Sequence, residues 1–292
     1  MRSLLAILLT LFIPVSAWAW GEKGHLMINQ VAIDAAAAKL PEFMNAAREQ
    51  IIYNGFEPDR WRREEKSPMN IAQEVDHFFD SEKWGAISTI PSDRYSFLQQ
   101  LVERKGDLKT GYVPYAIIEN YGRLVNAFRF WRSAKTPNDR KSASANGIYV
   151  AGVMGHYVGD ASQPMHLTIH HHGWAARVPN PQHFTTDTGI HSRYESAYVD
   201  AAIDGSSVRR NVRVPQRLAN VWDSIKQYLS QSLAEVVPLY ELEKVGEFNP
   251  DRPRTRGTDF IAAELSRAGT MLAALWYTAW LESAEPPSTP AK

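Results

Sequence analysis

Apolar side chains recur at helical spacing along most of this chain, whereas the alternation typical of strands is rare. The clearest apolar stripe lies near the carboxyl end and consists of Leu265, Leu272, Leu275, Trp276 and Trp280. Such a stripe is typical of a helix that turns one face to the core. The pattern predicts helices over residues 26–40, 41–53, 92–105, 113–133, 142–160, 189–203, 214–236 and 258–283. We therefore expect an all-α fold.

Proline, glycine and polar residues mark the expected ends of these helices. Pro41 is expected to open the second helix and Ser92 to cap the third. Loops are expected at residues 53–58, 168–189 and 248–257. No internal repeat divides the chain, so we expect one domain over residues 20–285. A proline-rich tail over residues 286–292 is expected to be disordered.

The amino terminus has the features of a signal peptide over residues 1–19. Arg2 precedes an apolar run over residues 4–15, and an Ala-x-Ala motif ends at Ala19. The run is shorter than the roughly 20 apolar residues that span a bilayer, although an uncleaved anchor is the alternative. The mature protein is then expected to begin at Trp20, to be periplasmic or secreted, and to contain no transmembrane segment.

The composition narrows the possible chemistry. The 292 residues include 32 basic and 32 acidic side chains, nine histidines and no cysteine. Balanced charge argues against nucleic-acid binding through a broad basic surface, and 44% hydrophobic residues argue against disorder. Without cysteine there is no disulfide and no thiolate ligand, even in an oxidising compartment. Metal ions bound by histidine could supply the missing cross-links.

Several histidines stand at metal-binding spacing. His156 and Asp160 are four residues apart on a predicted helix, and His191 and Glu195 repeat this spacing. Residues four apart share one helix face, and imidazole with carboxylate suits zinc. His166 follows a proline that is expected to turn it toward the same place. One pair alone is more often a solvated contact, but the combination predicts a zinc site.

Further candidate ligands lie upstream. A free α-amine and carbonyl at Trp20 would form a chelate that His25 could complete. His77 and Asp59 are the other candidates. Taken alone, each of these two has an ordinary alternative role, as a buried hydrogen-bonded histidine or as a helix-capping aspartate.

Together these residues resemble the trinuclear zinc enzymes of the phospholipase C and P1/S1 nuclease superfamily. The most specific match is Gly-His-Tyr-Val-Gly-Asp-Ala-Ser-Gln-Pro-Met-His over residues 155–166, and the resemblance runs from Trp20 to about Asp200. It implies a mainly helical domain with metals at the base of a cleft and hydrolysis of phosphate esters. It also implies three zinc sites, formed by Asp59, His77, His156 and Asp160; by His166, His191 and Glu195; and by Trp20, His25 and a bridging Asp160.

The resemblance implies that bound zinc activates a water for attack on phosphorus. Asp59 would orient this water or accept its proton, unless the metals alone suffice. Arg62 would bind the phosphoryl oxygens, and a surface salt bridge is its alternative role.

The two branches of this superfamily imply different substrates. If the chain resembles the nucleases, Phe78 is expected to stack on a base and Asp80 to form a hydrogen bond with the edge of that base. Their alternatives are a core aromatic residue and a carboxylate that supports His77. Glu195 and the absence of cysteine look more like the bacterial phospholipases C. We predict hydrolysis of single-stranded nucleic acid or nucleotides, and the alternative prediction is hydrolysis of phospholipid.

The remaining possibilities are weaker. The run His170, His171 and His172 is expected to be an exposed polar segment, with an accessory metal or phosphate contact as the alternative. A non-enzymatic zinc-binding protein and a degenerate family member are further alternatives. No stable protein partner is predicted.

Overall fold

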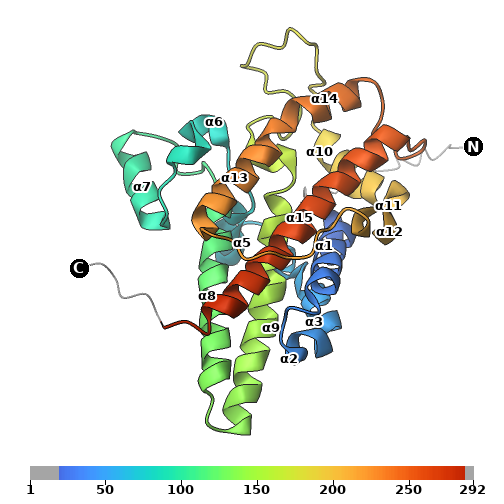
Figure 1. Ribbon diagram of the computed structural model, residues 1–292. Helices are drawn as coiled ribbons and strands as arrows, with labels where there is room; N and C mark the ends of the chain where they lie inside the picture. Colours follow the sequence, from blue (N-terminus) through green and yellow to red (C-terminus); the bar gives the residue numbers. More distant parts are fainter. Residues whose placement is uncertain (1–19, 287–292) are drawn as a thin grey trace, which may run out of the picture.

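The described part of the chain is 66% helical and contains no strand, which confirms the all-α prediction. The computed structural model describes residues 20–286 (Figure 1). The predicted signal peptide, and all of the predicted tail after Pro286, lie outside the described residues. Within residues 20–286, none of the helices has both the length and the apolar character needed to cross a bilayer.

Four long helices form the body of the molecule: α1 (Gly21–Ala36), α8 (Val113–Ser133), α9 (Pro137–Asp160) and α15 (Thr255–Glu282). Helices α8 and α9 pair as a long hairpin, and α15 packs across both of them and along α1 (Figure 1). The predicted stripe on α15 is buried as expected, except that Trp280 is only partly covered.

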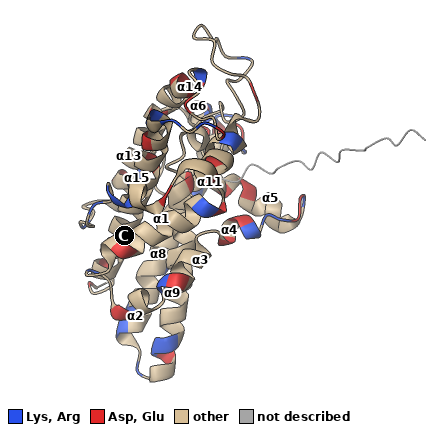
Figure 2. Ribbon diagram, turned by 90° about the vertical axis from the view of Figure 1, so that its right-hand side faces the viewer, with Lys and Arg blue, Asp and Glu red and all other residues tan. Residues whose placement is uncertain are grey.

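Shorter elements surround this body: α2 (Glu42–Ala46), α3 (Arg48–Asn54), α4 (Glu57–Arg60), α5 (Pro68–Glu74), η1 (Val75–His77), α6 (Ser81–Trp84), η2 (Ile87–Thr89), α7 (Arg94–Glu103), η3 (Pro164–Leu167), α10 (Ile190–Ser192), η4 (Arg193–Ala197), α11 (Tyr198–Ala202), α12 (Gly205–Arg209), α13 (Val221–Ala234) and α14 (Val236–Lys244). Of these, η4 is a π-helical turn and the other η elements are 3₁₀ turns. On the face shown in Figure 2, basic and acidic residues are interspersed along the helices, in keeping with the balanced charge.

Several predicted boundaries are wrong for local reasons. The helix predicted over 41–53 is broken at Ala47, whose backbone leaves the helical region between α2 and α3. The helix predicted over 214–236 begins only at Val221, where the Asn220 side chain accepts the Asp223 N–H as its cap. The α9 helix begins earlier than predicted, at Pro137, because Thr136 caps it. Helices α4 and α5 were not predicted.

Glycines in α9 allow α1 to approach closely. A β-carbon at Gly155 would lie 1.8 Å from Asn29 Oδ1, and one at Gly159 would lie 2.9 Å from Ile28 Cδ1. The buried Asn29 amide in turn donates to the carbonyls of Ile51 at 2.7 Å and Gly152 at 3.0 Å. Asn29 therefore ties α1 to both α3 and α9, which places the side chains of α1 beside the last turns of α9.

Candidate metal centre

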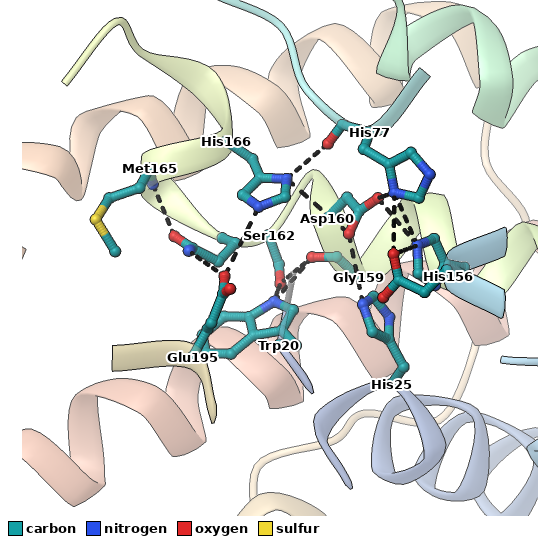
Figure 3. Close-up of polar contacts among 12 residues, drawn as sticks. Trp20, His25, His77, His156, Gly159, Asp160, Ser162, Met165, His166 and Glu195 are labelled. Carbon is teal, nitrogen blue, oxygen red and sulfur yellow. Dashed lines mark hydrogen bonds and ion pairs between the residues drawn. The ribbon is translucent and has the colours of Figure 1, made fainter. Parts of the chain in front are cut away.

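A buried cluster of histidines and carboxylates lies where α1, α4 and the end of α9 meet the short turns η1, η3, α10 and η4 (Figure 3). Its side chains are His25, Asp59, His77, His156, Asp160, His166, His191 and Glu195. These are all the side-chain metal ligands that the sequence predicts, and the most exposed of them, His166, is only 7% accessible. Residues far apart in the sequence therefore converge on one place.

The cluster contains three groups that could each hold a metal ion. They are His25, His156 and Asp160; Asp59, His77 and His156; and His166, His191 and Glu195. Asp160 lies between its neighbours: Oδ2 is 3.0 Å from His77 Nδ1, whereas Oδ1 is 3.5 Å from His25 Nε2. His25 and His156 stack with ring centroids 3.9 Å apart, which the close packing of α1 on α9 permits.

Backbone carbonyls orient three of the histidines. The Nδ1 atoms donate to the carbonyls of distant residues: His156 to Gly55 at 3.0 Å, His166 to His77 at 2.6 Å, and His191 to His171 at 3.0 Å. A neutral imidazole that donates from Nδ1 presents a lone pair at Nε2. In each of these three residues that lone pair faces the cluster, as metal-binding histidines require.

The opposed lone pairs need a cation or a proton between them. His166 Nε2 and His191 Nε2 are 3.1 Å apart, although the Nδ1 protons of both rings are already engaged. Glu195 Oε2 adds a third electron-rich atom, 2.7 Å from His191 Nε2. Electron-rich atoms repel one another at such distances in a dry interior, so this geometry suits a bound cation.

Burial dominates the protonation equilibria of the cluster. It lowers the pKa of His77 and of His156 well below the usual value for histidine. Both rings are therefore neutral, and each has a lone pair that can bind a metal ion. Burial raises the pKa of Asp160 well above its ordinary range and that of Asp59 to about 8. The pKa of Glu195 is instead lowered, because the nearby His191 and His166 rings outweigh the effect of its burial.

Unsatisfied carboxylate oxygens complete the fit to a metal. Asp59 Oδ2, both side-chain oxygens of Asp160, and Glu195 Oε1 are buried without a hydrogen-bond partner among the described residues. Buried hydrogen-bond acceptors in proteins normally have a donor, so carboxylate oxygens without one indicate a bound ligand. Imidazole nitrogen and carboxylate oxygen together form a donor set that binds transition metal ions. The buried groups can therefore hold metal ions.

Trp20 lies beside the cluster through its side chain. The buried indole Nε1 donates to the Gly159 carbonyl at 2.9 Å and to Ser162 Oγ at 2.8 Å (Figure 3). The Trp20 carbonyl accepts the Gly24 N–H at 3.1 Å, and its backbone is left-handed with φ of 50°. Coordination by a free α-amine at this residue depends on cleavage before it, and stays a prediction.

A cavity of about 450 Å³ opens over the cluster. His77, His166 and His191 line its floor, and Arg62, Lys83 and Lys109 are the basic residues of its walls. The Arg62 side chain is 21% exposed and forms an ion pair with the buried Asp59, with Nη1 3.5 Å from Oδ1. Glu74, Asp80 and Asp107 belong to the same lining, and Lys83 pairs with Asp80 at 2.9 Å and with Asp107 at 2.8 Å, so the walls carry both signs of charge.

The two predicted substrate contacts also reach this cavity. Phe78 is half-buried and lines it, so it is not a core residue. Asp80 is 2% exposed, and its Oδ2 pairs with Lys83 Nζ at 2.9 Å. Asp80 Oδ1 has no hydrogen-bond partner among the described residues, and no hydrogen bond joins Asp80 to His77 there. The alternative role of Asp80, support for His77, therefore finds no contact.

The three adjacent histidines differ in environment: His172 is exposed as predicted and His171 is partly exposed, whereas the prediction is wrong for His170, which is buried. His170 is 6% exposed, stacks on Trp174 at 3.8 Å, and accepts the Ala175 N–H at Nδ1. His171 and His172 line the cavity over the cluster. A lowered pKa of about 4, caused first by burial and then by nearby His191, keeps His172 neutral.

Sequence reasoning assigned no role to Gln163, which lies within the specific motif. Its Nε2 donates to Glu195 Oε2 at 3.2 Å, and its Oε1 accepts the Met165 N–H at 2.7 Å. Gln163 therefore orients a candidate ligand. Lys83 was missed as well. The sequence indicated Lys83 only through its position three residues after Asp80, and acidic and basic residues at this spacing are too common to identify a site.

Comparison with known proteins adds no family assignment. No protein-family model matches the chain, and no curated protein matches it. The function is therefore argued from the geometry of the site.

Proposed function

We propose that this chain is a zinc-dependent phosphoesterase with a centre of three ions, acting on single-stranded nucleic acid or nucleotides. The observation that carries the proposal is the convergence of imidazole lone pairs. His156, His166 and His191 each commit Nδ1 to a backbone carbonyl and turn Nε2 toward the cluster. A protein builds such an arrangement for metal ions of the zinc type.

The proposed ligand sets are those that the resemblance implies, and the grouping of the side chains supports them except for Trp20, which no measured distance places among the ligands. Asp59, His77, His156 and Asp160 would hold the first ion, His166, His191 and Glu195 the second, and Trp20, His25 and Asp160 the third. The two oxygens of Asp160 face different histidines, which supports a bridging role. His156 also lies within reach of the group that contains His25, so it shares the boundary between two of these sites.

The residues around the cluster suit hydrolysis of a phosphate ester. When bound, zinc ions act as Lewis acids and lower the pKa of water toward neutrality. Asp59 places an unpartnered oxygen at the edge of the cluster and can orient an attacking water or accept its proton. Arg62 stands beside it and lines the cavity, and its guanidinium is a type of donor that binds phosphoryl oxygens.

Two residues of the cavity support a nucleobase as part of the substrate. Asp80 Oδ1 is a buried acceptor that needs a donor, and the exocyclic N–H groups of bases provide one. Phe78 offers a ring face on the same cavity, where a base can stack.

The test uses zinc-loaded protein that begins at Trp20. Turnover is measured on single-stranded DNA, RNA, 3′-nucleotides, phosphatidylcholine and bis-(p-nitrophenyl) phosphate, with metal content by mass spectrometry. We expect about three zinc ions per chain and turnover of the nucleic-acid substrates. Hydrolysis of phosphatidylcholine alone would reverse the choice of substrate. Three bound zinc ions without turnover of any ester would instead identify a zinc carrier.

A matched pair of arginine variants tests the phosphoryl contact. Arg62→Gln removes a charge that lines the cavity and is expected to lower kcat/KM about 100-fold. Arg63→Gln removes the same charge from an exposed neighbour and is expected to change it less than about two-fold. Equal effects of the two substitutions would remove Arg62 from the proposed machinery.

A further inference from the structure

An irregular segment borders a second cavity on α15, which is open to solvent. Residues 211–220, called the strap here, leave α12 and cross α15 before α13 begins (Figure 1). Two threonines of α15 hold the strap: the Arg213 N–H donates to Thr270 Oγ1 at 3.2 Å, and the Leu218 N–H donates to Thr278 Oγ1 at 3.0 Å. The strap, α13 and α15 surround a cavity of about 760 Å³, the strap cavity.

The strap cavity is separate from the metal centre. None of the described residues that line it also lines the cavity over the cluster. It is larger than a single ion requires, and its volume falls in the range of small-molecule sites. A ligand in it would therefore have a body as well as a charged group.

The side chains that line the strap cavity are positive or neutral. Arg213 comes from the strap and Arg267 from α15, and no aspartate or glutamate is among the described lining residues. The neutral hydrogen-bonding groups around the arginines include Asn211, Gln216, Ser224, Gln227 and Gln231. Met271 and Ala274 add an apolar patch. The arginines of this lining can bind an anion, and the amide side chains can form hydrogen bonds with hydroxyl groups.

Both arginines keep hydrogen-bonding capacity. Arg213 is exposed and has no carboxylate partner among the described residues. Arg267 is held from beneath by Glu264, Ser232 Oγ and the Ser162 carbonyl, all through Nη2. Its Nη1 makes no hydrogen bond within the described chain, and its buried Nε is likewise without a partner there. A guanidinium with free N–H groups binds phosphate or carboxylate through paired hydrogen bonds.

We propose that the strap cavity is a binding site for a small organic oxyanion: a phosphate or carboxylate group on a hydroxyl-rich body. The arginines receive the oxyanion, and the glutamine and asparagine side chains receive the hydroxyl groups. The site requires no metal ion and shares no residue with the proposed phosphoesterase centre, so the two proposals stand or fall separately.

Calorimetric titration of the full mature chain with its metal content tests the proposal. The probes are ribose 5-phosphate, gluconate, inorganic phosphate and ribose. Ribose 5-phosphate or gluconate is expected to bind with a Kd below about 1 mM, and ribose at least about ten-fold more weakly. The comparison of the two anions identifies which oxyanion is preferred. Absence of binding by both anions at about 10 mM would overturn the proposal.

Two substitutions of the same charge locate the binding. Arg213→Gln is expected to weaken binding at least about ten-fold, because a charge-assisted contact is lost. Arg217→Gln is the matched control: it lies in the same strap and pairs with Glu285, but it does not line the cavity. It is expected to change the Kd less than about two-fold. Equal weakening by both variants would show non-specific surface charge and overturn the proposal.

A steric variant gives an independent readout. Ala263 lines the strap cavity from an exposed position on α15, so Ala263→Trp fills the space without changing charge or the helix core. It is expected to abolish binding of the anion while the circular dichroism spectrum stays unchanged. A folded Ala263→Trp protein that binds the probe as tightly as the natural chain would place the ligand elsewhere and refute the assignment.

Discussion

Replacing Asp59 by asparagine is expected to change stability in opposite directions with and without metal ions. Asp59 is 2% exposed, and burial raises the pKa of its carboxyl from 3.8 to about 8, although Arg62 partly counters the effect. Between these pH values the folded, metal-free protein holds a proton that the unfolded chain has released. The unfolded state binds fewer protons, so metal-free stability falls as pH rises from about 4 to 8.

The size of the effect follows from this pKa. A rise from 3.8 to about 8, at about 1.4 kcal/mol for each pH unit, corresponds to a cost of about 6 kcal/mol when the pH reaches 8. Relaxation and water entry reduce this upper limit, as for other buried charges. Asparagine has the same shape and does not titrate. We therefore expect the stability of metal-free Asp59→Asn, relative to the natural chain, to increase by at least about 2 kcal/mol between pH 5 and pH 8.

The assay is urea unfolding of chelator-treated protein at several pH values, followed by tryptophan fluorescence. The control is Asp200→Asn, an exposed aspartate without an ion pair among the described residues. With zinc the order reverses: the variant has lost a candidate ligand, so zinc is expected to raise its melting temperature less than that of the natural chain. If the free energies of unfolding of the metal-free natural and Asp59→Asn proteins change with pH in parallel, the electrostatic reasoning is refuted. Equal stabilisation of both by zinc would remove Asp59 from the metal centre.

Three further predictions test the centre and its scaffold. Two extra residues before Trp20 are expected to lower bound zinc from about three ions to about two by mass spectrometry, because a free amine is lost, and unchanged content would exclude that ligand. Gln163→Ala is expected to weaken zinc binding about ten-fold in chelator competition, since it frees Glu195 to rotate, and an unchanged affinity would make this contact incidental. Gly155→Ala is expected to cost at least about 2 kcal/mol in urea unfolding, because its β-carbon would lie 1.8 Å from Asn29 Oδ1. Gly122→Ala, with nothing within 4 Å of the added carbon, is its control and is expected to keep or raise stability, because alanine favours the helix; a similar loss in both would mean that the contact with Asn29 does not decide the cost.

The sequence by itself determined most of the long helices, because their signals are local. The helix over residues 113–133 begins and ends as predicted, since a proline near its start and a continuous apolar face define it. The pairs His156 with Asp160 and His191 with Glu195 are also local, because four residues make about one turn. Even so, the second pair does not lie on one regular α-helix, because His191 lies on α10 and Glu195 on the π-helical turn that follows it.

Tertiary structure decided the chemistry of the cluster. The carbonyls that orient His156 and His166 belong to residues 101 and 89 positions away in the sequence, and no short-range pattern reports them. The same holds for the strap cavity, whose wall includes a non-helical segment that hydrogen-bonds to two threonines of α15. Spacing along one helix specifies which side chains share a face, whereas the direction of a lone pair depends on which distant backbone atom lies beside the ring.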